Sequence, residues 1–439
     1  MCSKICEGEN LVKKFESLTV LFICIVSLSF VACGNSQNTL SSKAQTMYNK
    51  KGMIGFDRFL EKHDYIPIRD ESKNGATPFL LAIKNSDMER MNIFLQKGAE
   101  IIEKDNDGND SIDYAIASGN SETINFIIHN TSDDYWNSID ENGLLPCVKF
   151  INKSKDFGII QNVLYLTNNL SFVDSKNKSL LMFASQNNTD VRVAKFFLDN
   201  EINLIDKKNE NEWTSVMYAA RYNPNPSVME DLILRGANTE PNSVGLTLTM
   251  LASCNKNPGV LFTLLKYKNE VKNYTTKGKT ALMYACENQQ DSSIIKMLIE
   301  NGADINATDN DGKSALIYAL ENYEKPDVIY VLISAGVKTE ITDKNGKTVS
   351  DYLAINEKLK TTDLETALGV AKLNNIKIEA VSEEKEILNS DENEAVTDLS
   401  NLDTNGQEVE TGKEEVLNKD DDSSTDMTSD VVGTALDLE

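Results

Sequence analysis

The segment that decides the fold is Glu300–Ala319, which reads ENGADINATDNDGKSALIYA. It contains a glycine, Gly302, that can end a helix in the left-handed conformation. The Asp-Asn-Asp-Gly run at positions 309–312 supplies turn residues. Ser314 can cap a new helix with its hydroxyl group, and the apolar residues after it recur at helical spacing. The segment therefore predicts the end of one helix, a turn and the start of another helix.

The same arrangement recurs along the chain at intervals of 33 to 35 residues. We call the residue two places after the turn glycine the cap position. Nine such positions align, with Asn177 and Glu212 in place of the glycine in two of them: Thr77, Asp110, Leu145, Ser179, Thr214, Thr247, Thr280, Ser314 and Thr348. Five places later the chain carries Ala82, Ala115, Phe150, Ala184, Ala219, Ala252, Ala285, Ala319 and Leu353. A small residue there lets two helices approach closely. The period predicts stacked units that share one continuous core.

A Gly-Lys-Thr trio at 278–280 matches the end of a phosphate-binding loop. Such a loop also needs a glycine five residues earlier, and Asn273 stands at that place. Similar trios begin at Gly312 and Gly346, where the required glycine is replaced by Ala307 and Ile341. Because the three trios lie about one repeat apart, they belong to the repeated unit, and we expect no bound nucleotide.

The unit resembles the ankyrin repeat. The residues that carry the match are Gly75-Ala76-Thr77-Pro78-Phe79, Gly236-Ala237, Gly302-Ala303-Asp304-Ile305-Asn306 and the spacing from cap position to small residue. The resemblance implies an all-α solenoid of about eight to nine helix–turn–helix units over residues 70–368, with outward hairpin loops. Residues 46–69, which include Phe56, Phe59 and Leu60, fit an N-terminal capping half-repeat. No histidine occupies the third place after the cap position, where the family commonly has one.

The front of the chain has the pattern of an export signal. Lys13 and Lys14 precede a mostly apolar run, Leu18–Val31, that is too short to span a bilayer comfortably. The following Phe30-Val31-Ala32-Cys33 resembles the lipobox of bacterial lipoproteins, although Phe30 stands where leucine is usual. The resemblance implies that residues 1–32 are a signal peptide and that Cys33 carries a lipid such as palmitate. A plain signal peptide and an uncleaved anchor remain alternatives. Residues 33–45 are polar and predict a flexible tether.

The acidic charge of the chain is concentrated at its end. Of the formal net charge of −24, residues Glu379–Glu439 contribute −17, from 20 Asp/Glu and 3 Lys, without any aromatic residue or proline. This composition predicts that residues 369–439 are disordered. The tail is either a solvated, solubilising segment or a binder of cations or of a basic partner. The chain before this tail is mildly acidic, so it lacks the basic surface that a nucleic-acid-binding protein needs.

Residues for catalysis or metal binding do not form a recognisable constellation. The two histidines, His63 and His129, lie two repeats apart and away from any nucleophile motif. The Asp-Asn-Asp-Gly runs at Asp105 and Asp309 resemble the start of a calcium loop but lack its alternating ligands and its final glutamate. We therefore expect no enzyme activity, no cofactor and no metal.

Beyond Cys33 the exported part would hold three cysteines: Cys147, Cys254 and Cys286. An odd number spread over a long chain is no disulfide framework. Buried free thiols are the expectation, and a bridge between Cys254 and Cys286, which lie in neighbouring units, is the alternative.

The resemblance also implies where partners bind, because ankyrin proteins tend to use hairpin tips and the inner face of the first helices. The residue before the cap position reads Lys178, Trp213, Leu246, Lys279, Lys313 and Lys347 in successive units, and Arg221 and Tyr222 follow seven and eight places after Thr214. A tryptophan near tyrosine and arginine has the composition of a binding hot spot. We predict partner binding at Trp213, Arg221, Tyr222, Leu246, Lys279, Lys313 and Lys347. The alternative is that these lysines are ordinary solvated turn residues.

These observations predict a membrane-anchored ankyrin-repeat protein of the cell envelope that binds a protein partner without catalysis. By resemblance to lipoprotein sorting, Gly34 after Cys33 favours the outer membrane, on its periplasmic side or at the cell surface. The alternative is an envelope structural or protective factor that tethers or stabilises one dedicated enzyme.

Overall fold

The computed structural model describes residues 40–200, 204–267, 270–288, 291–323, 326–359 and 363–369. All of these belong to the unit that ends at Ile378. The predicted signal peptide, Cys33 and the predicted acidic tail beyond residue 369 lie outside the described residues. No helix in the described part has both the length and the hydrophobicity that a bilayer span requires.

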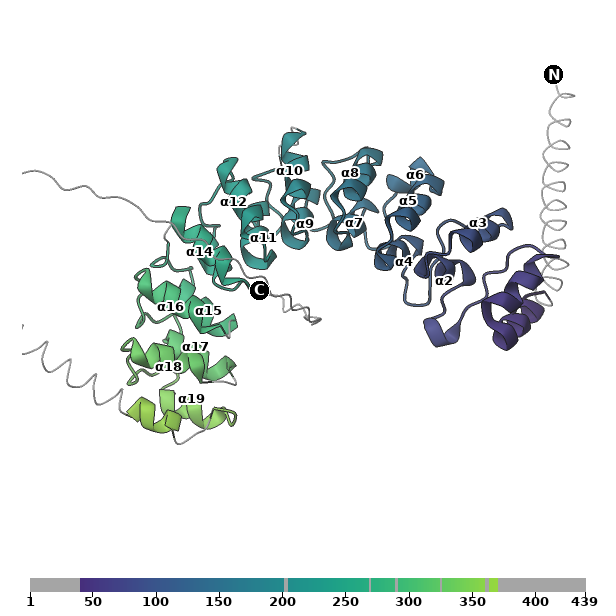
Figure 1. Ribbon diagram of the computed structural model, residues 1–439. Coiled ribbons are helices and arrows are strands. Elements are labelled where there is room, and N and C mark those ends of the chain that lie inside the picture. The colour runs from purple at the N-terminus through teal and green to yellow at the C-terminus, as the bar shows by residue number, and fades with distance from the viewer. Residues whose placement is uncertain are drawn as a thin grey trace, which may run out of the picture. The chain divides into compact units, whose positions relative to one another are not determined.

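The described chain is helical, and most helices come in pairs (Figure 1). The first helices of successive units are α2 (Pro78–Lys84), α4 (Ser111–Ser118), α7 (Cys147–Lys153), α9 (Leu180–Asn187), α11 (Ser215–Tyr222), α13 (Leu248–Ala252), α15 (Ala281–Asn288), α17 (Ala315–Asn322) and α19 (Val349–Ile355). The second helices are α3 (Met88–Gln96), α5 (Ser121–Asn130), α8 (Phe157–Leu166), α10 (Val191–Asp199), α12 (Pro226–Leu234), α14 (Pro258–Tyr267), α16 (Ser292–Glu300) and α18 (Asp327–Ser334). Outside the pairs lie a helix at residues 40–60, η1 (Glu71–Lys73), α6 (Asp133–Trp136) and a helix at residues 363–369.

The units stack in chain order, so that first helices pack against first helices and second helices against second helices. Helix α11, for example, contacts α9, α13 and its own partner α12. The hairpin loops are closed by isolated antiparallel bridges, such as Tyr274 to Thr280 and Thr308 to Ser314. This arrangement confirms the predicted all-α solenoid, in which each unit covers the apolar side of the next.

The cap positions act as the sequence predicts in most units. Thr77 Oγ1 accepts a hydrogen bond from the Leu80 N–H at 3.2 Å, and Ser314 Oγ accepts one from the Ile317 N–H at 3.4 Å. The third unit differs, because Leu145 offers no acceptor and α7 begins after Pro146 without a side-chain cap. Thr214 also makes no capping bond, and its buried hydroxyl has no partner among the described residues.

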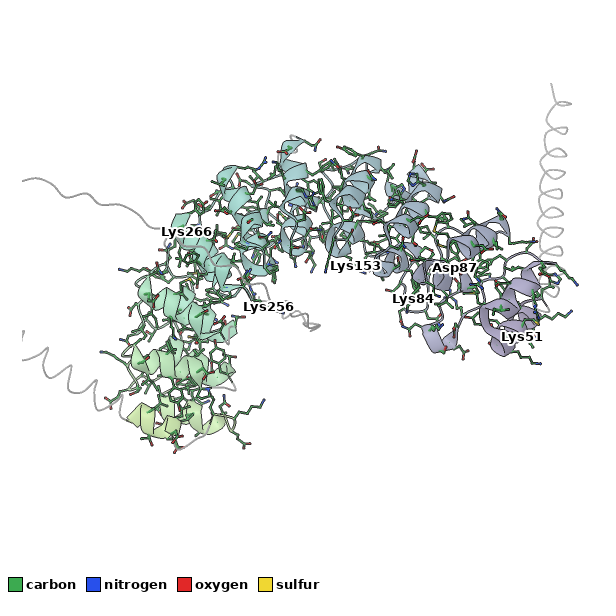
Figure 2. All side chains as sticks on the ribbon, in the orientation of Figure 1. Lys51, Lys84, Asp87, Lys153, Lys256 and Lys266 are labelled. Atoms are coloured by element: carbon green, nitrogen blue, oxygen red, sulfur yellow. The ribbon has the colours of Figure 1, made fainter. Side chains whose placement is uncertain are left out.

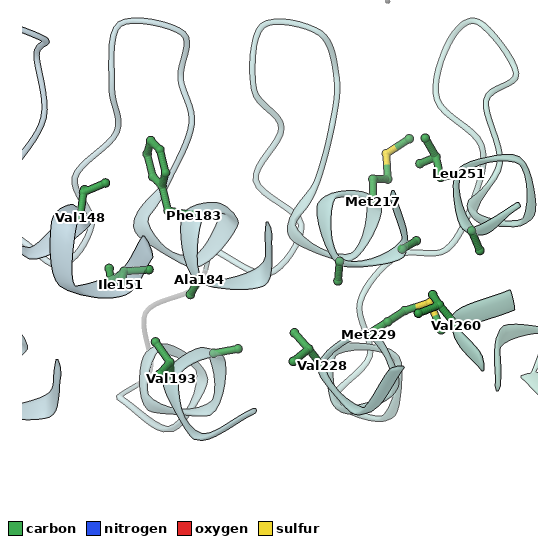
Figure 3. Close-up of a cluster of buried hydrophobic side chains, with 14 of the residues drawn as sticks. Val148, Ile151, Phe183, Ala184, Val193, Met217, Val228, Met229, Leu251 and Val260 are labelled. Atoms are coloured by element: carbon green, nitrogen blue, oxygen red, sulfur yellow. The ribbon is translucent and has the colours of Figure 1, made fainter. Parts of the chain in front are cut away.

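The small residues lie where first and second helices meet. Ala184 is buried on the side of α9 that faces α10, and Val193 points toward it from α10 (Figure 3). Met217 and Leu251 point from their helices toward the hairpin loops instead (Figure 3). The core is therefore continuous from unit to unit and has a layer on each side of the first helices.

The N-terminal helix begins before the predicted capping half-repeat and ends within it. Helical residues begin at 40, within the segment predicted as a tether, and Phe56 and Leu60 are buried in this helix. Phe56 contacts the rings of Tyr65 and Phe94, each at a centroid distance of 6.0 Å. These aromatic contacts attach the helix to the first repeat.

Candidate protein-binding surface

The hairpins of several units hold a tyrosine of the first helix in a fixed place. Asp309 Oδ1 accepts hydrogen bonds from the backbone N–H groups of Asp311 and Lys313, at 2.9 and 2.8 Å. Its other oxygen accepts the Tyr318 hydroxyl at 2.7 Å. The ninth unit repeats this with Asp343 and Tyr352 at 2.8 Å. One carboxylate thus shapes the hairpin and orients the ring beside it.

The predicted lysine positions lie between these rings. The Lys279 Nζ is 4.9 Å from the centroid of Tyr284 and 4.4 Å from that of Tyr318 in the next unit. Lys313 lies in the same way between Tyr318 and Tyr352, at 5.7 Å from each. These contacts are cation–π interactions that join neighbouring units.

Two of the predicted lysines are also ion-paired within their own unit. Lys279 Nζ lies 2.7 Å from a carboxylate oxygen of Glu287, and Lys313 Nζ lies 2.7 Å from one of Glu321. Each glutamate stands eight residues after its lysine. The charge of the stripe is therefore neutralised in the seventh and eighth units. Lys347 of the ninth unit is exposed and has no such glutamate, because the corresponding position holds Ile355, which is 64% exposed.

The fifth unit carries a cluster of rings that we call the aromatic patch: Trp213, Tyr218 and Tyr222. The Trp213 centroid lies 5.3 Å from that of Tyr218 and 6.0 Å from that of Tyr222. Trp213 is half-buried, since it packs against the core, whereas Tyr222 is 43% exposed. Of these two rings, Tyr222 is therefore the more exposed.

Cations surround the aromatic patch. The Arg221 guanidinium lies 5.1 Å from the Tyr222 centroid and donates from Nη1 to the Cys254 carbonyl at 2.7 Å. Lys178 Nζ lies 4.5 Å from the Tyr218 centroid and bonds the neutral side chain of Gln186. Burial lowers the pKa of Lys178 to about 8.

Lys256 is exposed on the side of the first helices, as are Lys84 and Lys153, whereas Lys266 lies on the side of the second helices (Figure 2). Within the described ranges, no carboxylate pairs with Lys178, Arg221 or Lys256. These cations are therefore not neutralised by an ion pair, unlike Lys279 and Lys313 in the seventh and eighth units.

Leu246 and the cysteines contribute to the packing of the units. Leu246 is half-buried against the core one unit after Trp213. Cys254 and Cys286 are buried free thiols, which confirms the expectation and excludes the alternative bridge. Burial raises the pKa of Cys254 to about 11, so this thiol is unreactive at neutral pH.

The histidines make local contacts: His63 stacks on Phe59 at 4.5 Å, and His129 Nδ1 bonds the Asn125 carbonyl at 2.6 Å. In the part of the chain that the structure describes, no three or more His, Cys, Asp or Glu residues gather as metal ligands would.

A set of asparagines was missed by the sequence reasoning. The Asn223 side-chain amide donates to the carbonyls of Ser185 and Asn188 in the preceding unit, at 2.9 and 2.8 Å. Asn188, Asn255 and Asn356 make the same pair of bonds to the units before them. The signal was an asparagine eight or nine places after the cap position in four units.

Part of the chain also matches a known family. Residues 249–345 match a family model described as ankyrin repeats in three copies. The fold is an ankyrin-repeat solenoid. An ankyrin repeat domain from Acinetobacter baumannii AYE is similar at 26% identity, over 44% of this chain and 96% of that chain, with a TM-score of 0.36. No curated protein matches the chain. Ankyrin repeats are scaffolds for protein–protein interaction and are generally non-catalytic.

Proposed function

We propose that the protein binds a partner protein through the exposed face of its first helices, and that the aromatic patch is the centre of this interface. The observation that carries the proposal is the cluster of Trp213, Tyr218 and Tyr222 beside Arg221, with Tyr222 43% exposed. Tryptophan, tyrosine and arginine dominate the binding energy of protein interfaces. No catalytic step is part of the proposal.

The proposed place of action is the cell envelope. The apolar run Leu18–Val31 and the lipobox-like residues ending at Cys33 support a lipid-anchored protein, with the outer membrane favoured by Gly34. A lipid at Cys33 would keep the solenoid at the membrane, where its partner would be found.

Crosslinking in intact cells, followed by membrane fractionation, tests both parts. Substituting Cys33 with serine should release the protein from the membrane fraction and stop incorporation of labelled palmitate. Substituting Trp213, Arg221 and Tyr222 together should abolish the crosslinks while leaving the protein in the membrane fraction. Crosslinks that survive the triple substitution would show that another surface binds. A single stoichiometric envelope enzyme among the products would favour the alternative role of stabilising that enzyme.

A further inference from the structure

The exposed face of the first helices divides into two parts by the pairing of its charges. In the seventh and eighth units each lysine of the stripe has a glutamate of its own, as Lys279 has Glu287. In the fourth unit the equivalent partner of Lys178 is the neutral Gln186, and in the fifth unit the two positions hold Trp213 and Arg221. An electrostatic preference for a partner is therefore strongest around the aromatic patch.

The rings of the aromatic patch are already covered on one side by cations. Lys178 lies 4.5 Å from the Tyr218 centroid, and Arg221 lies 5.1 Å from that of Tyr222. A ligand with a quaternary ammonium group would need free ring faces and would meet like charges here. The chemistry thus disfavours a cationic ligand and favours one that carries negative charge.

Acidic residues border the patch on its hairpin side. Asp174 Oδ1 accepts the backbone N–H of Lys178 at 2.7 Å, and Glu212 accepts that of Ser243 at 2.9 Å. Without the −17 of residues Glu379–Glu439, the chain still carries a formal net charge of −7, since 48 Asp/Glu stand against 41 Lys/Arg. A nucleic-acid strand, with a charge at every phosphate, would be repelled along much of this surface. A partner with a few carboxylates grouped beside an apolar side chain meets the cations and avoids the acids.

We infer that the aromatic patch recognises a segment of a partner protein in which a large apolar side chain stands next to acidic residues. The apolar side chain covers Trp213 and Tyr222, and the carboxylates meet Arg221 and Lys256. Lys256 lies two residues after Cys254, whose carbonyl holds Arg221 in place. The inference rests on the proposed function and names the chemistry of the partner.

The probe is a displayed library of short random peptides, selected on the full chain and on two variants. The first variant carries Trp213→Ala and Tyr222→Ala, and its fold is checked by circular dichroism. The second, Lys266→Gln, removes a cation from the side of the second helices (Figure 2). The wild type and Lys266→Gln should enrich peptides that combine Asp or Glu with Trp, Phe or Leu, and the double variant should not.

Individual enriched peptides are then titrated by the fluorescence of Trp213 in a Trp136→Phe background, since Trp136 is fully buried away from the patch. Arg221→Gln with Lys256→Gln should weaken binding about tenfold, the size of one good interface contact. Replacing the acidic residues of the peptide by lysine should weaken the binding of the peptide by the same factor.

The inference would be overturned if no peptide were enriched, or if the enriched peptides were basic or uncharged. It would also be overturned if the double variant enriched the same peptides as the wild type. Tighter binding of a single-stranded oligonucleotide than of any peptide would also overturn it. The proposed function fails differently, because it requires crosslinks in cells that depend on the patch. If those crosslinks are found but the selected peptides lack acids, only the partner chemistry is wrong.

Discussion

Replacing Asn223 by alanine removes a link between the fourth and fifth units. Its amide nitrogen donates to the carbonyls of Ser185 and Asn188, at 2.9 and 2.8 Å, and the residue is fully buried. Both carbonyls belong to the C-terminal end of α9, where no further turn supplies an N–H group. The side chain therefore does for one helix end what the next helical turn would have done.

The cost follows from the groups that lose their partners. A buried acceptor without a donor costs about 1–3 kcal/mol, so two carbonyls cost about 2–4 kcal/mol if water recovers part of the loss. Asn223→Asp keeps the shape but points a carboxylate at two carbonyl oxygens. We expect it to cost at least as much at neutral pH. The burial and these oxygens would raise the aspartate pKa, so stability should recover as pH falls and the acid becomes a donor.

Urea denaturation followed by circular dichroism measures these differences at neutral and acidic pH. The matched control is Asn187→Ala. Asn187 also joins two units, by a 2.8 Å bond to Asn152, but it is exposed, so its loss should cost under about 1 kcal/mol. If Asn223→Ala unfolds at the same urea concentration as the control, the hydrogen bonds from Asn223 to the two carbonyls do not stabilise the fold. If the stability of Asn223→Asp does not change with pH, the side chain at this position does not act as a hydrogen-bond donor.

Three further outcomes are expected. Glu103→Gln should raise the melting temperature at pH 8 but not at pH 4. Burial raises the pKa of Glu103 from 4.5 to about 7, so the stability that this residue contributes falls as pH rises between these values and is constant above them. Equal gains at both pH values would contradict this. Lys149→Met should cost about 2–4 kcal/mol in urea denaturation, since Lys149 lies 2.6 Å from Asp110 and 2.7 Å from Asp113, and of these two only Asp113 keeps another cation among the described residues, Lys153 at 3.0 Å. The loss should shrink as pH falls toward 2, because, against the opposing effect of burial, hydrogen bonds from Lys149 and Lys153 lower the pKa of Asp113 to about 2. Acetylation of Lys178, followed by mass spectrometry, should be half-maximal near pH 8, whereas an exposed lysine should titrate near its ordinary pKa of about 10.4.

The fold was predictable because each unit repeats the same short sequence signals for helix starts, helix packing and turns. Thr77 and Ser314 cap their helices, and the small residue at Ala184 lies between paired helices. Such signals depend on neighbours in the sequence, and nine copies in register reinforce one another. The third unit departs from this pattern at Leu145 and still keeps its helix, because stacking on its neighbours supplies what the missing cap does not.

The properties of the candidate surface were less predictable, because they depend on side chains that the fold brings together from the hairpin and the first helix. The lysine stripe was visible as a sequence pattern, yet its charge depends on glutamates eight residues away. Lys279 and Lys313 have such partners, whereas Lys178 faces Gln186. Likewise Tyr218 was overlooked because its place in the aromatic patch requires the ring of Trp213 from the preceding hairpin.

One consequence is that stability and recognition use different residues of the same repeated helix. Asn188, Asn223 and Asn255 are buried and bond backbone carbonyls of the preceding unit, so we expect their loss to weaken the stacking. The position before the cap varies freely among lysine, leucine and tryptophan, because there the side chain lies over its neighbours' rings and keeps part of its surface in solvent. Where lysine is paired with glutamate, the unit supports its neighbours. Where tryptophan and Arg221 replace that pair, we propose that the same two positions contact a partner.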